Sequence, residues 1–437
     1  MLSSRTMTLL LAAALTTPGA AHAQLKAVVG DWPAWMGPDR TGVSPETGLL
    51  KEWPKDGPKL LWKASDIGNG YSTPSVAGGK IFLISNRGTD DEFVLALSAK
   101  DRKKIWSKKI GKVGNPNQRP PYPGSRSTPT VEGDTVYVLG SDGDLACLDV
   151  ATGEVRWKKN LRTEFGGKPG IWAYAESPLI DGDVLVCTPG GDKATLLALN
   201  KKNGAMIWQA PVPKGEAAGG RNAMTGNTAA YASPIVATVG NVKQYIQFLH
   251  GGLVGVSAKD GKLLWRYEGV KGITNCTTPL FHDDCVFVSA AGRGRSATSG
   301  SALVKLTASD GRITTKEVYH IQDLANHHGG VVRVGGYVYG TSNSGLVCID
   351  FKTGETKWQN RSVGKGSIAA ADGRLYVRSE DGPTALVEAM PGRYKELSRF
   401  EQPDRSGKKA WPHPVIAGGR LYMRDQDVLL CFDVKEN

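Results

Sequence analysis

Residues 127–157 read STPTVEGDTVYVLGSDGDLACLDVATGEVRW, and this stretch decides the fold. Short apolar runs at 130–131, 135–139 and 145–148 are divided by turn-forming residues at 132–134 and 141–144. A further turn at 149–153 leads into a fourth run that ends on Trp157. Apolar alternation bounded by Gly and Asp predicts a four-stranded antiparallel meander, not a helix. Such a sheet exposes apolar side chains on both faces, so it needs similar neighbours.

The same unit recurs along the chain. Eight starts align on the residue that enters the first strand: Tyr71, Arg126, Ala175, Tyr231, Cys276, His328, Lys365 and Trp411. Five units end on a tryptophan, namely Trp106, Trp157, Trp208, Trp265 and Trp358. The fifth unit is expected to carry Thr315 at that position, and the seventh is degenerate over residues 393–400.

The two ends of the repeat region complement each other. The eighth unit stops after its third strand, at Val434, whereas residues 59–63 (KLLWK) form a strand with its own Trp62 and no unit before it. An N-terminal strand that completes the last sheet closes a ring without an open edge. We therefore predict an all-β fold, an eight-bladed β-propeller of four-stranded antiparallel blades in which the N-terminal strand completes the last blade.

The residues before the repeats divide into two parts. Arg5, an apolar run at 7–15 and Ala-His-Ala at 21–23 predict a signal peptide over residues 1–23. Residues 24–58 are dense in Pro, Gly and Trp, which indicates an extended N-terminal arm, and residues 59–437 form the propeller. No later run is apolar enough to span a bilayer. We expect an exported protein, periplasmic or secreted, that is soluble and monomeric after the signal peptide is removed.

Charge narrows the range of partners. The chain has 54 Lys and Arg against 42 Asp and Glu, a net charge of +12, and the basic residues occur as scattered pairs beside turns. This pattern is typical of a solvated surface, with an anionic polymer of the cell envelope as the alternative partner. Nucleic acid is not expected as a partner of an exported protein.

Cysteine spacing argues against a disulfide framework. Cys147, Cys348 and Cys431 occupy one repeat position in different units, which places them too far apart to pair. We expect buried free thiols, while the sequence leaves the state of Cys187, Cys276 and Cys285 open.

The aligned starts map one mouth of the central channel, because the first strand of each blade lines that channel. Residues that only hold blades together should be alike from unit to unit, whereas this column is polar, aromatic and cationic. Convergent polar groups in a concavity are typical of a binding site, and unconstrained solvated loops are the alternative. The candidate ligand-binding residues, with neighbours, are Tyr71, Arg126, Tyr174, Glu176, Tyr231, His327, His328, Lys365, Trp411 and His413.

Three of these candidates are histidines. His327 and His328 are adjacent, and adjacent side chains on an extended strand point to opposite faces, so they rarely bind one metal ion. No metal site is therefore expected. A metal-dependent hydrolase or lyase that uses these two residues and His413 is kept as an alternative.

The repeats also resemble those of a known family. The pattern L-x-x-L-D-x-x-T-G-x-x-x-W, present as LACLDVATGEVRW and LVCIDFKTGETKW, is similar to the tryptophan-docking repeat of the pyrroloquinoline-quinone (PQQ)-like propellers. That superfamily includes the quinoprotein alcohol dehydrogenases. It also includes non-catalytic members such as the propeller lipoprotein of the outer-membrane β-barrel assembly machinery. The resemblance covers residues 59–434 and implies a propeller fold.

The resemblance also frames the function. Quinoprotein dehydrogenases hold PQQ between a tryptophan and a disulfide of adjacent cysteines, beside a calcium ion with acidic and amide ligands and an aspartate base. This chain has no adjacent cysteines, and its entry positions offer only Glu176 as an acid, although Trp411 could serve as the tryptophan platform. We expect no cofactor, with PQQ and calcium as the alternative.

The expected function is that of an exported, non-catalytic binding or scaffold propeller. Its site would be the channel mouth, and its partner a protein, or a small-molecule or polymer ligand, of the cell envelope. The first alternative is a PQQ-dependent quinoprotein oxidoreductase acting on an alcohol or sugar.

Overall fold

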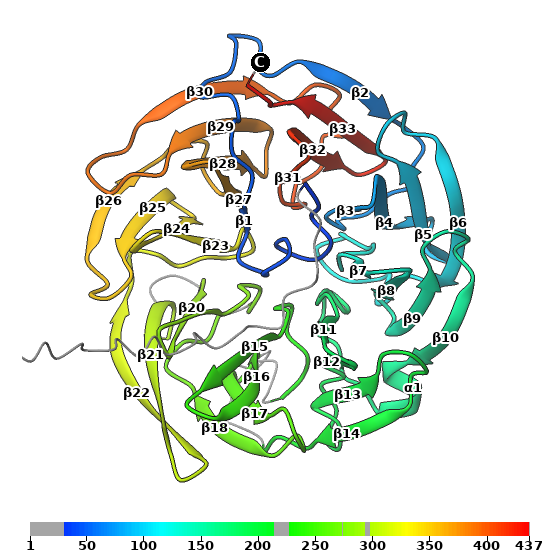
Figure 1. Cartoon of the computed structure of the whole chain (residues 1–437), viewed down its shortest axis with the longest axis vertical. Coiled ribbons are helices and arrows are strands. Elements are labelled where there is room, and N and C mark those ends of the chain that lie inside the picture. Colours follow the sequence, from blue (N-terminus) through cyan, green and yellow to red (C-terminus); the bar gives the residue numbers. More distant parts are fainter. Residues whose placement is uncertain (1–29, 214–226, 273, 293–297, 437) are drawn as a thin grey trace, which may run out of the picture.

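The computed structural model describes residues 30–213, 227–272, 274–292 and 298–436. The expected signal peptide lies outside these residues. Eight sheets stand in a ring around a central channel (Figure 1), which confirms the predicted eight-bladed propeller. Each blade is a four-stranded antiparallel sheet, and one blade gains a fifth strand from the N-terminal arm.

The blades follow the chain in order. Blades 1 to 4 comprise β3 (Ser75–Ala77), β4 (Lys80–Arg87), β5 (Asp91–Ser98) and β6 (Lys104–Gly111); β7 (Thr130–Glu132), β8 (Thr135–Leu139), β9 (Asp144–Asp149) and β10 (Val155–Asn160); β11 (Leu179–Asp181), β12 (Val184–Cys187), β13 (Leu196–Asn200) and β14 (Met206–Ala210); and β15 (Ile235–Val239), β16 (Val242–Leu249), β17 (Gly252–Ser257) and β18 (Leu263–Tyr267). A short helix, α1 (Leu161–Phe165), follows β10.

The second half of the ring repeats this order. Blades 5 to 8 comprise β19 (Leu280–His282), β20 (Cys285–Ala290), β21 (Gly300–Ser309) and β22 (Arg312–Ile321); β23 (Val331–Val334), β24 (Tyr337–Ser342), β25 (Gly345–Asp350) and β26 (Thr356–Asn360); β27 (Gly366–Ala371), β28 (Arg374–Ser379), β29 (Pro383–Glu388) and β30 (Glu396–Glu401), joined by β1 (Val43–Ser44); and β31 (Val415–Ala417), β32 (Arg420–Asp425) and β33 (Val428–Asp433), joined by β2 (Leu60–Ala64).

Blade 8 closes the ring as predicted. Its outer strand β2 comes from the N-terminal side and pairs antiparallel with β33, with Trp62 opposite Cys431 and Ala64 opposite Leu429. The N-terminal strand therefore removes the edge that β33 would otherwise expose.

Four of the closing tryptophans each donate a hydrogen bond to the next blade. Trp106 of blade 1 donates its indole N–H to the carbonyl of Val150 in blade 2 at 3.0 Å. Gly153 of the same turn has φ of 74°, and a Cβ there would lie 2.5 Å from the Trp106 ring. The T-G step of the repeat thus requires glycine, both for the left-handed turn and for the approach of the tryptophan. Blades also pack through apolar clusters that they share, such as the one containing Phe82 of blade 1 and Val136 of blade 2.

Blade 5 corrects one prediction. The structure places Tyr319, not Thr315, at the closing-tryptophan position, because β21 and β22 form a hairpin of ten-residue strands. Tyr319 donates its hydroxyl to the carbonyl of Phe351 in blade 6 at 2.9 Å. A Cβ on Gly354 would lie 2.7 Å from the ring of Tyr319. The corresponding glycines of other blades approach tryptophan rings in the same way. A longer hairpin moved the docking residue four positions along the chain.

Blade 7 has no closing tryptophan of its own. Its position is taken by Ser398, the residue opposite Leu386 beside the strand bulge. Trp53 of the N-terminal arm donates its backbone N–H to the Ser398 hydroxyl at 2.9 Å and stacks on Tyr376 with ring centroids 5.8 Å apart. A segment outside the repeats therefore supplies the missing indole.

Residues 30–58, called here the N-terminal arm, run across the centre of the ring in Figure 1. Trp32 pairs with Val76 of blade 1, and β1 pairs in parallel with β27 of blade 7. On the far side of the channel Arg40 donates to the carbonyls of Ser177 and Pro178 in blade 3 at 2.8 and 2.9 Å. The arm is thus anchored to widely separated blades.

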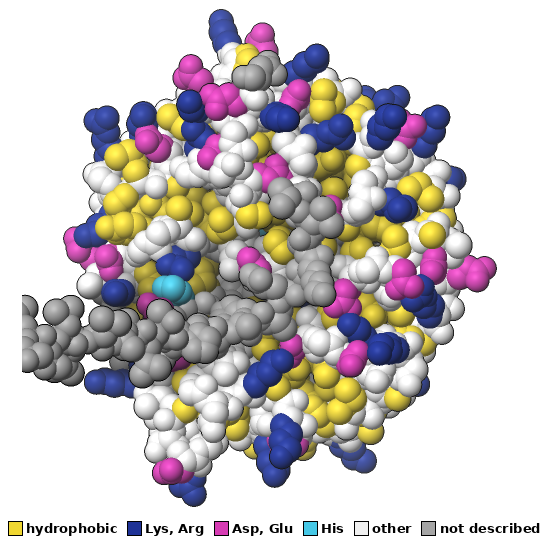
Figure 2. Space-filling model, viewed as in Figure 1, with side chains coloured by type: hydrophobic (Ala, Val, Ile, Leu, Met, Phe, Trp, Pro, Cys, Tyr) yellow, Lys and Arg dark blue, Asp and Glu magenta, His cyan; other side chains and the backbone are white. Residues whose placement is uncertain are grey.

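The outer surface carries its charge in dispersed form. On the face shown in Figure 2, Lys and Arg side chains are distributed around the ring among Asp and Glu, without one basic patch. The six cysteines are free, and Cys276 and Cys285 are half-buried while the others are buried. The free state of Cys187, Cys276 and Cys285 settles the pairing that the sequence left open.

Candidate binding cavity at the channel mouth

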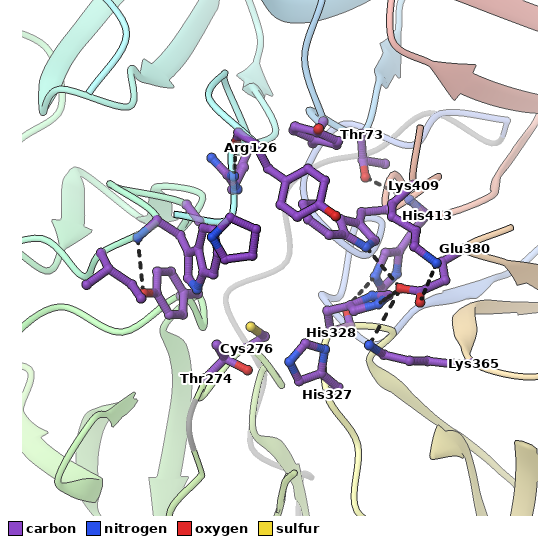
Figure 3. A pocket seen from close by; sticks show the side chains of 18 of the residues that line it. Thr73, Arg126, Thr274, Cys276, His327, His328, Lys365, Glu380, Lys409 and His413 are labelled. Atoms are coloured by element: carbon purple, nitrogen blue, oxygen red, sulfur yellow. Dashed lines mark hydrogen bonds and ion pairs between the residues drawn. The ribbon is translucent and has the colours of Figure 1, made fainter. Parts of the chain in front are cut away.

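A cavity of about 450 Å³ lies at the centre of the ring. Figure 3 shows it from the face opposite to that of Figure 1, since the colours run around the ring in the other sense. All eight blades and the N-terminal arm border it. Most of the contacts come from segments that lead into the first strand of a blade. Its walls are made by Trp35, Tyr71, Thr73, Arg119, Pro120, Tyr122, Arg126, Ile171, Trp172, Ala175, Tyr231, Ser233, Thr274, Cys276, His327, His328, Lys365, Glu380, Lys409, Trp411 and His413.

Most of the candidate residues from the sequence meet at this cavity. Those that line it are Tyr71, Arg126, Tyr231, His327, His328, Lys365, Trp411 and His413. Tyr174 and Glu176 are not among its walls: they flank Ala175, which is, and neighbouring residues of an extended segment point to opposite sides. The repeat alignment therefore located the cavity without specifying which neighbours face it.

Tyr174 and Glu176 are instead buried between blades. The Tyr174 hydroxyl donates to the carbonyl of Pro189 at 2.9 Å. Glu176 accepts hydrogen bonds from the backbone N–H of Thr188 and from the side chain of Gln247. Burial raises the pKa of Glu176 to about 7, against the effect of these hydrogen bonds.

Aromatic rings form a continuous band on the cavity wall. Trp411 lies between Tyr71 and Tyr122, with centroid distances of 4.7 and 4.9 Å, and Tyr122 also faces Trp172 at 6.3 Å. Tilted and edge-to-face contacts at these distances are favourable and hold the rings in place. The band gives the cavity a rigid apolar side.

Glu380 is a carboxylate surrounded by donors. Its Oε2 accepts from His328 Nε2 at 2.9 Å and from Trp411 Nε1 at 3.1 Å, and it lies 3.5 Å from Lys365 Nζ. Its Oε1 lies 3.2 Å from Lys409 Nζ. Although burial opposes ionisation, the hydrogen bond from His328 and the nearby cations hold the pKa of Glu380 well below its usual range. Glu380 is therefore an anion whose oxygens are already occupied.

Arg126 has a different environment. Its guanidinium donates to the backbone carbonyls of Gly124, at 2.8 Å, and of Tyr122. It stacks over the rings of Tyr71 and Trp411 at 5.2 and 6.0 Å. Burial lowers the pKa of Arg126, but an arginine remains charged at neutral pH. Within the described residues, no carboxylate forms an ion pair with Arg126.

The three histidines are neutral groups in this setting. Burial lowers the pKa of all three, to about 4 for His413 and to about 3 for His327. Both adjacent histidines face the cavity, with ring centroids 5.2 Å apart, so the expected opposite orientation is wrong. They precede β23 in a bent segment, where strand alternation does not apply. Across the described ranges, no group of three or more His, Cys, Asp or Glu side chains could hold a metal ion.

Several wall residues were missed by sequence reasoning. Tyr122 and Trp172 lie in the connections between blades, whose length was the available signal. Glu380 follows β28, and Lys409 lies between β30 and β31. A turn after the second strand returns to the end where the first strand begins, so the turn between β28 and β29 could have been assigned to this mouth.

The N-terminal arm closes one end of the cavity. Trp35 donates its indole N–H to the hydroxyl of Thr278 in blade 5 at 2.8 Å, and its ring lies 4.6 Å from that of His413 in blade 8. Trp35 also lines the cavity. The central channel is therefore a recess, and the indole of Trp35 forms part of its base. A recess with aromatic walls, fixed cations and one satisfied carboxylate can bind a small ligand or a protruding segment of a partner.

Fold and cavity together define an eight-bladed PQQ-like propeller with a central recess. The family model described as outer membrane protein assembly factor BamB (PQQ_2) matches residues 27–188, 90–360 and 295–411. The chain belongs to this family.

Similar sequences agree with this assignment. The outer membrane protein assembly factor BamB of Salmonella typhimurium is 26% identical over 139 residues, which cover 32% of this chain and 31% of the relative. The chain thus spans about a third of the length of that relative. The BamB of Escherichia coli is 23% identical over 372 residues, covering 74% of this chain and 87% of the relative.

Similar structures show the fold. The crystal structure of BamB from Moraxella catarrhalis has a TM-score of 0.58 at 16% identity and covers 86% of this chain and 98% of its own. The quinohemoprotein alcohol dehydrogenase of Comamonas testosteroni has a TM-score of 0.63 at 13% identity and covers 93% of this chain and 81% of its own. Since an assembly factor and an alcohol dehydrogenase share the architecture, the fold does not decide between binding and catalysis.

Proposed function

We propose that the protein is an exported, non-catalytic propeller of the cell envelope that binds a ligand or a protein partner in the mouth cavity. The observation that supports this proposal is the contrast between the residues that hold the blades together and the residues of the cavity wall. The docking residues repeat around the ring, whereas the wall residues differ at equivalent positions, as Tyr71, Arg126, His328, Lys365 and Trp411 do. A solely structural channel has no need of differing, converging side chains.

Family membership favours a scaffold role for this binding site. The relatives are named for outer membrane protein assembly, so a protein of the envelope is the partner class we propose. The expected signal peptide at residues 1–23 fits an exported location. No helix among the described residues has the length and apolar character needed to cross a membrane.

A complementation experiment tests the scaffold role. In a strain that lacks this protein, outer-membrane β-barrel proteins should fall in amount, and the full-length chain should restore them. A Lys365→Glu/Trp411→Ala variant, shown to fold by circular dichroism, should not restore them. Arg312→Gln serves as the control because Arg312 is exposed at the outer end of the β21–β22 hairpin. Unchanged β-barrel protein levels in the deletion strain would refute the assembly role.

PQQ with calcium is a poor fit to the cavity. A calcium ion takes carboxylate and carbonyl oxygens as ligands. Glu380 is the acidic residue in the described wall, and its oxygens already accept from His328 and Trp411 and contact lysines. The cysteines are free, and none adjoins another in the sequence. We therefore propose no step through this cofactor. Dye-linked alcohol oxidation after incubation with PQQ and calcium, if lost in Trp411→Ala, would instead establish the oxidoreductase.

A further inference from the structure

We propose that the cavity selects an organic anion, with a carboxylate-type group bound by Arg126 and an apolar body packed against the aromatic band. The aromatic band is formed by Tyr71, Trp411, Tyr122 and Trp172. This inference rests on the proposed function, because it takes the cavity as the binding site. It adds the charge and shape of the occupant.

The first argument is the charge balance of the wall. Arg119, Arg126, Lys365 and Lys409 are basic, and Glu380 is the acidic wall residue. The two lysines lie 3.5 and 3.2 Å from Glu380, and Lys409 also pairs with Asp381 at 2.5 Å. Two lysines are thus balanced by two carboxylates, which leaves the arginines as the excess. A surplus of fixed positive charge in a recess raises the local concentration of anions.

The second argument is that the Arg126 guanidinium has hydrogen-bond donors beyond those that its two backbone contacts use. A guanidinium has five N–H donors in a planar fork. Two hydrogen bonds, to the carbonyls of Gly124 and Tyr122, fix its orientation without neutralising it. Stacking on Tyr71 and Trp411 restricts it further, so little conformational entropy is lost when an anion binds. The remaining donors suit a carboxylate, which arginine binds in bidentate geometry.

The third argument is the shape of the space beside Arg126. Figure 3 shows Arg126 and Lys365 on opposite sides of the cavity, with aromatic rings between them. The volume of about 450 Å³ accommodates a ring system or a large apolar side chain. His327 and His328 border the same space, and because burial lowers the pKa of both, they add no charge to it. A ligand with an anionic end and an apolar body would satisfy both features.

Two sources could present this chemistry, a small carboxylic acid or the C-terminus of a polypeptide that ends in an aromatic residue. Both offer one carboxylate next to an apolar ring. Matched probes separate charge from shape and also separate the two sources. Fluorescence of the wall tryptophans reports occupancy, and calorimetry gives the dissociation constant.

The experiment compares three ring probes of equal size with the full-length mature protein. These are 1-naphthoate, neutral 1-naphthalenemethanol and cationic 1-naphthylmethylamine. A second arm uses the tripeptide Gly-Gly-Phe with a free or an amidated C-terminus. We expect 1-naphthoate to bind at least about tenfold more tightly than the neutral probe, as a charge-assisted hydrogen bond provides. Tighter binding of the free-acid tripeptide than of 1-naphthoate would identify a polypeptide source, and the reverse a small molecule.

Variants test the role of Arg126. Arg126→Gln should weaken 1-naphthoate by about tenfold or more and leave the neutral probe unchanged, while Arg126→Lys should retain part of the preference. Arg312→Gln, an exposed arginine far along the β21–β22 hairpin, should change neither. If Arg126→Gln does not fold, salt dependence of the wild-type protein replaces it. Affinity for 1-naphthoate should then fall with added salt, and affinity for the neutral probe should not.

The failures of the two proposals are distinguishable. Equal binding of the three ring probes, or a preference for the cation, would overturn the anion selectivity and leave the cavity as a binding site. If no ring probe and no tripeptide binds, the inference that the cavity binds an organic anion is wrong. The assembly phenotype of the deletion strain is measured separately and does not depend on any probe.

Discussion

Trp35 of the N-terminal arm and His413 of blade 8 face each other with ring centroids 4.6 Å apart. One residue comes before the repeats and the other belongs to the last of them. Their contact is where the arm meets the cavity, because both side chains line it. The arm is therefore part of the binding site as well as a brace across the ring.

Replacing Trp35 by alanine should deepen the cavity and weaken the link between the arm and the ring. The indole also donates to Thr278 at 2.8 Å, so the change removes a hydrogen bond in addition to packing. For this half-buried side chain we expect a loss of about 2 kcal/mol in the free energy of unfolding. Urea unfolding measures the loss, and binding of 1-naphthalenemethanol should weaken with it. Trp172→Ala is the comparison, because it removes a ring of the cavity wall without touching the arm. It should weaken probe binding but lower the free energy of unfolding less than Trp35→Ala does. Equal stability of wild type and Trp35→Ala would show that the arm is not anchored here.

His413 should make the protein sensitive to acid. Burial lowers the pKa of His413 to about 4, whereas the ordinary value in an unfolded chain is about 6.5. A depressed pKa means that the unfolded state binds the proton more readily, so stability is complete above about pH 6.5 and is lost as the pH falls toward 4. At about pH 4.5 the loss from this residue should be about 2 to 3 kcal/mol.

Urea unfolding near neutral and acid pH measures this dependence. His413→Gln removes the titrating group, so its unfolding free energy should fall less between the two conditions than that of the wild type. His320→Gln is the comparison, since His320 is only half-buried and lies on the outer strand β22. An unchanged acid slope in His413→Gln would mean that His413 does not remain neutral in the folded protein.

The repeat period explains what the sequence could predict. Strand alternation and the T-G-x-x-x-W step specify local contacts, so they predicted the number of blades and the closure of the ring by the strand of Trp62. The docking role of Tyr319 was not predicted, because a longer hairpin shifts the register and the composition of a single strand does not reveal that shift. The docking of Trp53 on Tyr376 is a contact between distant segments with no repeat partner, so no local pattern predicts it.

The cavity was predictable only in part for a related reason. Aligned starts gave Tyr71, Arg126 and Trp411, because equivalent residues of a propeller meet at one mouth. Glu380 comes from a turn after a second strand, outside the aligned column. The ionised state of Glu380 depends on His328 and on lysines from two other connections. These residues come together only in the folded protein.

Neutralising Glu380 should strengthen anion binding. Glu380→Gln keeps an acceptor for His328 and Trp411 but removes the charge that balances Lys365 and Lys409. Because the cavity is partly desolvated, we expect this variant to bind 1-naphthoate about threefold to tenfold more tightly than the wild type does, with the neutral probe unchanged. Calorimetry with both probes measures the ratio. Glu355→Gln is the control, because Glu355 is exposed and pairs with Lys357 in the turn before β26. Weaker 1-naphthoate binding in Glu380→Gln would indicate that Glu380 orders the lysines more than it repels the anion.

Closure of the ring should depend on Trp62. Its ring is buried and lies 6.0 Å from Tyr422 of the same blade, and its strand joins the two ends of the chain. Trp62→Ala should cost about 3 to 5 kcal/mol in unfolding free energy and increase amide hydrogen exchange along β33, where β2 would detach. Trp106→Ala is the matched control, since it removes an equivalent indole from a blade whose strands are consecutive. It should lower stability by a similar amount while β33 stays protected. Equal protection of β33 in the two variants would mean that β2 holds the ring closed through its backbone ladder alone.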